Sequence, residues 1–289
     1  VSDPLNIISF PKKETWKDAE QRLTFRYSQV IEKQLGFRTI DVQDFQKNPN
    51  SRYVGGPQKL YAHYQLRLNT HVNAGFTAEK DQGEAFLKKR TPGYSYDKKI
   101  PKGFDFYSAY LHLHHLKHIQ AFVIGDYTIT FGQGLTAWNG NSFGKSAAIL
   151  YAKKTAQGIR PYSSVDEKKF MRGIATTLQQ KKFFLTVFYS HKTIDANVID
   201  TTQNGSPSVV SSLQETGIHA TIAELNDKHS VRQTVLGTNL SYHSNRLHIG
   251  FTGVHDYLNI PLNPLLRADN QLNSAATKNT NLGLDYNFV

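Results

Sequence analysis

The chain has 289 residues, no cysteine and a formal net charge of +11. This length is enough for one large β domain or two ordinary domains. The absence of cysteine excludes disulfide frameworks and thiolate metal sites, and no apolar run approaches the roughly 18 residues that a membrane-spanning helix needs. Tyrosine (15 residues) and phenylalanine (17 residues) are abundant, which favours β structure.

The positive charge indicates an anionic partner, such as nucleic acid, lipid headgroups, lipopolysaccharide or an anionic solute. The alternative is a solvated surface with a basic bias and no specific partner. The chain begins at Val1, without an initiator methionine or a visible signal peptide. We therefore expect a processed or partial chain.

Residues 1–20 are polar and contain two prolines, so we expect an irregular lead-in on the periplasmic side. From residue 21 onward, apolar and polar residues alternate with period two, which predicts strands with one apolar and one polar face. Ten such strands are predicted. They cover residues 21–31, 60–68, 72–79, 104–114, 118–126, 170–179, 182–191, 231–242, 246–258 and 278–289.

The connections between these strands alternate strictly between short and long. Short turns are expected at 69–70, 115–117, 180–181 and 243–245. Outer-membrane barrels have this pattern, with short periplasmic turns and long extracellular loops, whereas a soluble sandwich would not keep it over ten strands. We therefore expect an all-β fold, an antiparallel transmembrane β-barrel over residues 21–289 that is either complete or part of a larger barrel. The long connections are 32–57, 80–103, 127–169, 192–230 and 259–277.

Two of the long connections carry local signals. Thr221 and Glu224 form a capping-box pattern, which predicts a short helix that ends at about His229. Residues 204–212 are rich in small polar residues, and we expect a flexible loop tip there.

Glycines and aromatic residues interleave between Gly125 and Ser146. Glycine permits sharp turns and aromatic rings supply buried area, so we expect loop 127–169 to fold inward and plug the barrel. The alternative is that its aromatic residues form a binding ledge for a sugar or a base. A phosphate-binding loop at Gly140–Ser146 is excluded, because three residues separate its first glycine from the Gly-Lys-Ser and the motif needs four. The plug residues are Gly125, Asp126, Tyr127, Phe131, Gly132, Gln133, Gly134, Trp138, Phe143, Gly144 and Lys145.

The polar face of the early strands is basic. If the apolar face meets lipid, these side chains point into the lumen and favour anionic solutes or a polyanion. The alternative is that they pair internally with Glu79, Asp105 and Asp126, because lumenal charges are usually paired. The residues concerned are Arg22, Arg26, His63, Arg67, His71, His112, His114 and His118.

Signals for catalysis or metal binding are weak. His112, His114, His115 and His118 could bind zinc or copper, but no carboxylate or thiolate is suitably spaced nearby, so no metal site is predicted. There is no Gly-x-Ser-x-Gly elbow and no His-Glu-x-x-His motif. Only Ser108 or Ser190 with a strand histidine could serve a hydrolase, so we expect neither an enzyme nor a cofactor.

Several motifs together resemble one protein family. The main ones are Gly125-Asp126-Tyr127, Phe131–Leu135 and Phe143–Ser146, and supporting matches are Lys59–Tyr61, Ala78–Asp81, Gly103–Ser108 and Arg172-Gly173. From about residue 20 to its end, the chain resembles the outer-membrane barrels of Bacteroidota that carry a helix-hairpin-helix region near the N terminus. That region is not in this chain, and family members are generally longer, with more strands.

The resemblance implies a barrel in the bacterial outer membrane, in contact with lipids or lipopolysaccharide and with other outer-membrane or periplasmic proteins. The expected function is a channel or a scaffold subunit of an envelope assembly. One alternative is a barrel that binds or takes up nucleic acid, by analogy with the missing module. A second alternative is a soluble β-rich binding protein.

Overall fold

The computed structural model describes residues 19–68, 71–86, 103–139, 154–203, 205, 207–214, 216–263 and 276–288. The fold is all-β, and its main element is one antiparallel sheet of eleven strands. The predicted lead-in lies outside the described residues except for its last two positions, as do the predicted plug residues Phe143, Gly144 and Lys145.

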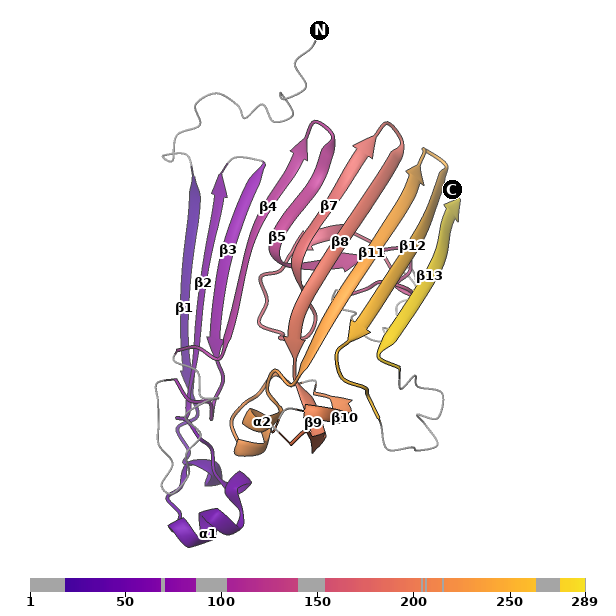
Figure 1. Cartoon of the computed structure of the whole chain (residues 1–289). Helices are drawn as coiled ribbons and strands as arrows, with labels where there is room; N and C mark the ends of the chain where they lie inside the picture. The colour runs from indigo at the N-terminus through magenta and orange to yellow at the C-terminus, as the bar shows by residue number, and fades with distance from the viewer. Residues whose placement is uncertain are drawn as a thin grey trace.

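Each of the ten predicted runs forms a strand, and consecutive runs pair antiparallel in the order β1-β2-β3-β4-β5-β7-β8-β11-β12-β13 (Figure 1). The predicted turns at 115–117, 180–181 and 243–245 lie at one end of the sheet, and the described residues between β1 and β2, between β3 and β4 and between β8 and β11 lie at the other end. The strands are β1 (Glu20–Gln29), β2 (Gln58–Leu68), β3 (Val72–Lys80), β4 (Phe106–Leu116), β5 (Ile119–Thr130), β7 (Met171–Gln180), β8 (Phe183–Ile194), β11 (Val231–His243), β12 (Leu247–Leu258) and β13 (Lys278–Phe288).

Three strands lie within connections that were predicted to be loops. β6 (Gly158–Pro161) pairs with the last residues of β5. β9 (Ala196–Thr201) and β10 (Pro207–Leu213) form a separate two-stranded sheet. The expected flexible tip at 204–212 is therefore wrong for the residues that form β10.

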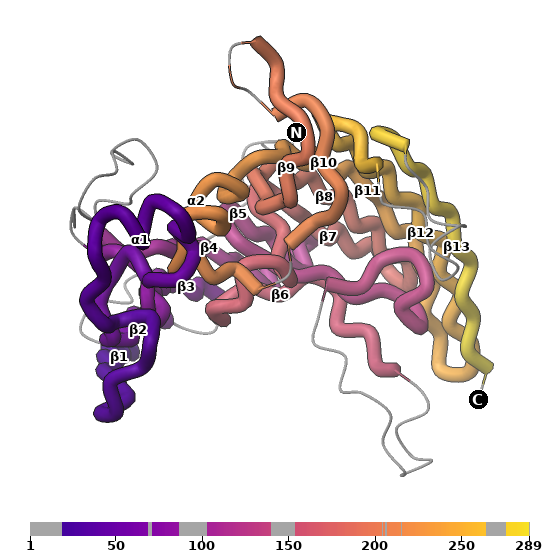
Figure 2. The backbone as a smooth tube through the Cα atoms, turned by 90° about the horizontal axis from the view of Figure 1, so that it is seen from below, coloured from indigo at the N-terminus to yellow at the C-terminus, as the bar shows by residue number. Residues whose placement is uncertain are grey.

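The sheet curves into an arch, and β1 and β13 are its two edges (Figure 2). Among the described residues, these two edge strands do not pair with each other, so the sheet is not closed into a barrel. β6 and the chain that follows β5 lie under the arch. We call this concave side the inner face of the sheet and the opposite side the outer face.

Side chains alternate between the two faces along each strand. In β8, Phe183, Leu185, Val187 and Tyr189 lie on the outer face and are exposed, whereas the alternate residues Phe184, Thr186, Phe188 and Ser190 point inward and are mostly buried. Residues that pair directly across neighbouring strands lie on the same face of the sheet. Val187 pairs with Thr176 on β7 and with Thr238 on β11, so both threonines also lie on the outer face. The outer face is thus apolar and exposed, and the inner face is largely polar and covered.

The short helices gather at the end of the sheet that carries the long connections (Figure 1). They are α1 (Val42–Lys47), α2 (Ile222–Asp227) and two 3₁₀ helices, Leu35–Phe37 and Pro49–Ser51. Together with β9 and β10, we call them the cap. One small apolar core of the cap contains Phe45, Val54, Ala85, Ile222 and Leu225. Among the described residues, no helix is long and apolar enough to cross a membrane.

The predicted capping box is present at the start of α2. The Thr221 hydroxyl accepts a hydrogen bond from the Glu224 N–H, and the Glu224 carboxylate accepts one from the Thr221 N–H. The helix ends at Asp227, two residues before the predicted position. α1 was not predicted, although Asp41 caps its N terminus by accepting a hydrogen bond from the Gln43 N–H.

The motif Gly125-Asp126-Tyr127 lies within β5 and not in a loop, because β5 continues to Thr130. Gly125 has a φ of +102°, and a Cβ there would lie 2.2 Å from the Ala109 carbonyl oxygen, so only glycine fits. The Tyr127 side chain is fully buried, and its hydroxyl donates to the Tyr189 carbonyl oxygen at 2.7 Å. Asp126 pairs with Arg172 through two hydrogen bonds, at 2.7 and 2.8 Å.

Candidate functional site

The segment that follows β5 crosses the inner face of the sheet (Figure 2). The Phe131 ring stacks on the Phe188 ring, with centroids 6.1 Å apart. Further along, Gly132 packs against Asp285 and Thr136 packs against Gly283, both on β13. The described part of the predicted plug therefore runs from the middle of the sheet to one of its edges.

Two aromatic residues of this segment have structural roles. Phe131 is buried in the main apolar core, together with Ala137 and Ile159. Trp138 is contacted by Lys154, whose ammonium lies 5.0 Å from the centre of the indole ring. The Gln133 side-chain amide donates to the Lys154 carbonyl oxygen and accepts from the Lys154 N–H, each at 3.0 Å. These contacts resemble the internal core of a loop more than an open ledge for a ligand.

Two cavities remain between the inner segment and the strands. The larger has a volume of about 630 Å³ and lies towards the short turns. The smaller has a volume of about 240 Å³, and Trp138, Lys192, Gln233 and Asp256 are among its lining residues. The charged and imidazole side chains that line the larger cavity are His112, His114, His115, Arg160, His243, His248 and Asp285.

The predicted lumenal residues do not form one site. Arg22 and Arg26 lie on β1 at the edge of the sheet, and His63 and Arg67 lie on the neighbouring β2. His112 and His114 line the larger cavity on β4, with ring centroids 4.9 Å apart. His71 and His118 were expected on strands, and this is wrong, because both lie in turns. The His118 side chain is exposed.

The predicted acidic partners form ion pairs with basic residues other than the predicted lumenal ones. Glu79 lies 2.9 Å from the Lys59 ammonium. Asp126 pairs with Arg172 at 2.7 Å, and Asp105 pairs with Lys228 at 2.6 Å.

The histidines and serines considered for chemistry are not assembled into sites. Among the described residues, sets of three ligand atoms within 4.8 Å of one another occur only around His219, not at His112, His114, His115 and His118. Ser190 Oγ accepts a hydrogen bond from the Arg172 N–H at 3.0 Å. Ser108 Oγ is buried without a hydrogen-bond partner among the described residues. Neither serine is hydrogen-bonded to a histidine in this part of the chain.

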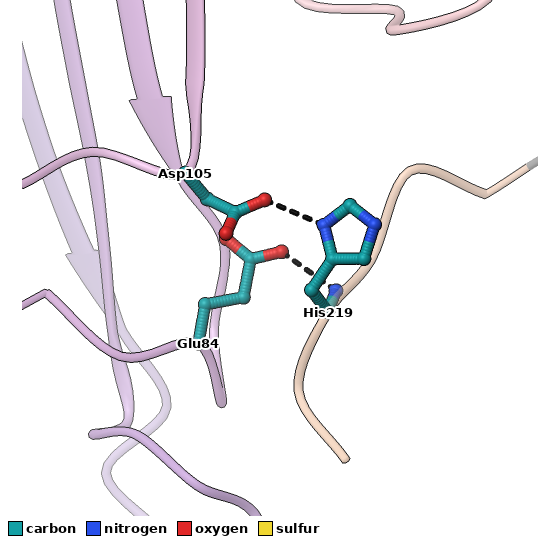
Figure 3. A group of neighbouring side chains, drawn as sticks. All are labelled: Glu84, Asp105 and His219. Carbon is teal, nitrogen blue, oxygen red and sulfur yellow. Dashed lines mark hydrogen bonds and ion pairs between the residues drawn. The ribbon is translucent and has the colours of Figure 1, made fainter. Parts of the chain in front are cut away.

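A buried cluster in the cap, centred on His219, was not predicted (Figure 3). The His219 side chain is 1% exposed. Its Nδ1 lies 2.6 Å from an Asp105 oxygen, and its Nε2 lies 3.1 Å from an Asp195 oxygen. Its backbone N–H donates to Glu84 at 2.9 Å. The Lys228 ammonium donates to the second Asp105 oxygen at 2.6 Å. One histidine thus joins two long connections that are distant in sequence, the one between β3 and β4 and the one between β8 and β11.

The charge state of this cluster follows from burial and hydrogen bonding. Burial disfavours the charged imidazole, but hydrogen bonds to Asp105 and Asp195 outweigh it and raise the pKa of His219 to about 10. Burial also acts on these two aspartates, yet their hydrogen bonds with His219 hold each pKa below its usual value. His219 is therefore an imidazolium that donates from both nitrogens.

Two glutamates near His219 have raised pKa values, in contrast to the two aspartates. Burial and the nearby charge of Asp105 raise the pKa of Glu84 to about 7 and the pKa of Glu167 to about 8. Glu84, Asp105 and His219 form one set of atoms able to hold a metal ion, and Glu167, Asp195 and His219 form another. However, both ring nitrogens of His219 already contact carboxylates, so the arrangement suits a proton-linked clamp better than a metal centre.

We expect the stability of the cap to fall as pH rises from about 5 to 9. The raised pKa values of Glu84, Glu167 and His219 mean that these three groups bind more protons in the folded cap than in the unfolded chain, whereas burial lowers the pKa of His229. The contributions of Glu84 and Glu167 are present near pH 4.5 and lost towards pH 7 and 8, and that of His219 is lost between about 6.5 and 10. Glu167→Gln should flatten the lower part of this profile, up to about pH 8.

This effect is measured by hydrogen exchange at the backbone amides of α2, in Glu167→Gln and in wild type at each pH. The comparison at equal pH removes the pH dependence of the intrinsic exchange rate. The exposed Glu32→Gln is the matched control and should follow wild type. A Glu167→Gln profile that parallels wild type from pH 5 to 8 would contradict the assignment of the proton to Glu167.

Comparisons of the chain with protein-family models, with curated proteins and with solved structures found no match. The case for a function therefore depends on the two faces of the sheet, the inner segment and the cap.

Proposed function

We propose that this protein is an integral β-barrel protein of the bacterial outer membrane, and that the arch forms a wall of the barrel. Its role there is that of a channel or a scaffold subunit in an envelope assembly. The observation that carries this proposal is the apolar, exposed outer face. Phe25 is 73% exposed, Leu240 is 49% exposed and Leu284 is 71% exposed.

This face is far more apolar than the surface of a water-soluble protein. Soluble monomers rarely expose contiguous apolar patches larger than a few hundred Å². Here the exposed apolar side chains continue from β1 across the sheet to β13. They include Leu23, Phe25, Tyr27, Phe76, Leu111, Ile124, Ile174, Leu178, Leu185, Val187, Leu236, Leu240, Phe251, Leu282 and Leu284.

The dimensions of the strands suit a bilayer. The ten strands have 9 to 13 residues, and a transmembrane β-strand needs about 9–11. The apolar row from Phe183 to Tyr189 covers six residue steps, about 20 Å along the strand. Because the strands of such barrels are tilted by about 35–45°, this row spans part of the height of their roughly 25 Å apolar band.

Aromatic residues flank this band at both ends of the strands, as in the girdles of outer-membrane barrels. Near the short turns they are Phe183, Tyr242 and Tyr286, and near the long connections they are Tyr107, Tyr189 and Tyr257. Aromatic rings of this kind favour the boundary between lipid and water. The family resemblance in the sequence supports the same location.

The two edges of the sheet need partner strands if the sheet lies in a membrane. On one side of β1 and on one side of β13, no strand pairs within the described residues. Hydrocarbon cannot satisfy unpaired backbone groups, so a barrel wall needs partner strands on both edges. The antiparallel order from β1 to β13 contains an even number of strands, so β1 and β13 run in opposite directions. Further strands can therefore pair antiparallel with both edges and close a barrel.

Reconstitution into lipid vesicles tests the proposal. We expect protein that is refolded from urea to gain β structure only with detergent or lipid, and to remain with the vesicles after a urea wash. A chain that folds and stays dissolved in buffer without detergent would contradict the membrane location.

A further inference from the structure

Three potential metal ligands lie side by side on the inner face, near the short turns. His243 is the last residue of β11, His248 is the second residue of β12, and Asp285 lies on β13. His243 is the direct cross-strand partner of His248, and Asp285 is the partner of Gly250. All three line the cavity of about 630 Å³. The ring centroids of the two histidines are 4.2 Å apart.

The carboxylate of Asp285 lacks the partners that a buried charge needs. Both of its oxygens are buried and accept no hydrogen bond within the described structure. It lies between Gly132 and Gly250, and a Cβ at Gly250 would be 2.5 Å from its Oδ1. A buried charge without donors costs free energy, so its presence requires an explanation. A cation is the simplest one.

The imidazole of His248 approaches this carboxylate, but its distance suits a shared ion better than a hydrogen bond. His248 Nε2 lies 3.7 Å from Asp285 Oδ2, which is too long for a hydrogen bond. Two ligands that each lie about 2.1 Å from a tetrahedral metal are about 3.4 Å apart. The observed gap is close to that value.

We propose that His248 and Asp285 bind a divalent transition metal ion of the zinc or copper class, with His243 as third ligand. Two histidines and one carboxylate are an established donor set for zinc. The cavity leaves room for water at the remaining position. In this structure His243 Nε2 lies 3.0 Å from Ser241 Oγ, and the three ligand atoms are not within 4.8 Å of one another. Metal binding therefore requires a rotation of the His243 side chain that brings one of its ring nitrogens to the ion.

Other clusters fit a metal less well. Both nitrogens of His219 already contact carboxylates, and the Lys228 ammonium occupies the same site. His112 and His114 stack on β4 but are not grouped with a carboxylate at ligand distance within the described residues. The sequence predicted no metal site because the three proposed ligands come from three strands, up to 42 residues apart.

Metal titration of the tag-free, full-length protein in detergent tests the inference. After chelator treatment, we expect the folded protein to bind one equivalent of Zn²⁺ by calorimetry. His248→Ala and Asp285→Asn should each weaken binding by at least about 100-fold, since the loss of a ligand exceeds the 10–100-fold effect of second-shell changes. The matched control is His255→Ala, on the outer face of β12, where the ring contacts Thr280. Its affinity should equal that of wild type.

Copper provides a second readout. The Cu²⁺ electron paramagnetic resonance spectrum should show coupling to two nitrogens in wild type and to one in His243→Ala. Circular dichroism should confirm that each variant is folded. Zn²⁺ binding that survives both His248→Ala and Asp285→Asn, or no binding by folded wild type, would overturn the proposal. This test does not depend on the barrel, so it can fail while the membrane location holds.

Discussion

Replacement of His219 by alanine should destabilise the part of the cap that contains α2 and residues 81–86. The substitution removes hydrogen bonds to Asp105 and Asp195 from a side chain that is 1% exposed. The breaking of a buried ion pair costs about 3–5 kcal/mol, because the remaining charges stay buried without their partner. Lys228 still compensates Asp105, but among the described residues the Asp195 carboxylate keeps one hydrogen bond, from the backbone N–H of His229.

The expected loss is local, because α2 packs in a small core of the cap, whereas β9 and β10 share a separate core with β11 and β12. Hydrogen exchange should therefore rise by about 100-fold or more at the amides of α2 and of residues 81–86, while the strands keep their protection. His255→Ala, which changes an exposed histidine, is the control. Unchanged exchange in His219→Ala would show that the clamp does not hold the cap.

The strands could be predicted because their signals are local. Period-two alternation and tight turns depend on neighbouring residues, and the predicted strand 170–179 became Met171–Gln180. The capping box at Thr221 is local as well, and α2 begins as expected. By contrast, β6 has only four residues and depends on the end of β5, which the sequence placed in a loop.

The sites were harder to predict because they join residues that are distant in sequence. Glu84 and His219 are hydrogen-bonded although 135 positions separate them. Asp126 and Arg172 both belong to motifs of the family resemblance, yet only the register of β5 and β7 shows that they pair. Strand patterns indicate which face a side chain occupies, but not which neighbour it meets across the sheet.

A positive charge on the outer face should impair insertion into lipid. Leu282 is 69% exposed in the middle of β13, opposite Gly253. Arginine on the lipid face costs about 2–4 kcal/mol at the bilayer midplane. In water, by contrast, arginine at so exposed a position would be nearly neutral, within about 0.5 kcal/mol. The sign and size of the effect therefore report which medium this face meets.

Asn281 is a matched control, because it is the adjacent residue, is also exposed and points to the inner face. The most direct measurement is the free energy of folding into lipid vesicles, from urea titrations of wild type, Leu282→Arg and Asn281→Arg. The membrane account predicts a loss of about 2–4 kcal/mol for Leu282→Arg and little change for Asn281→Arg. Equal stability of the two variants would contradict an outer face in contact with lipid.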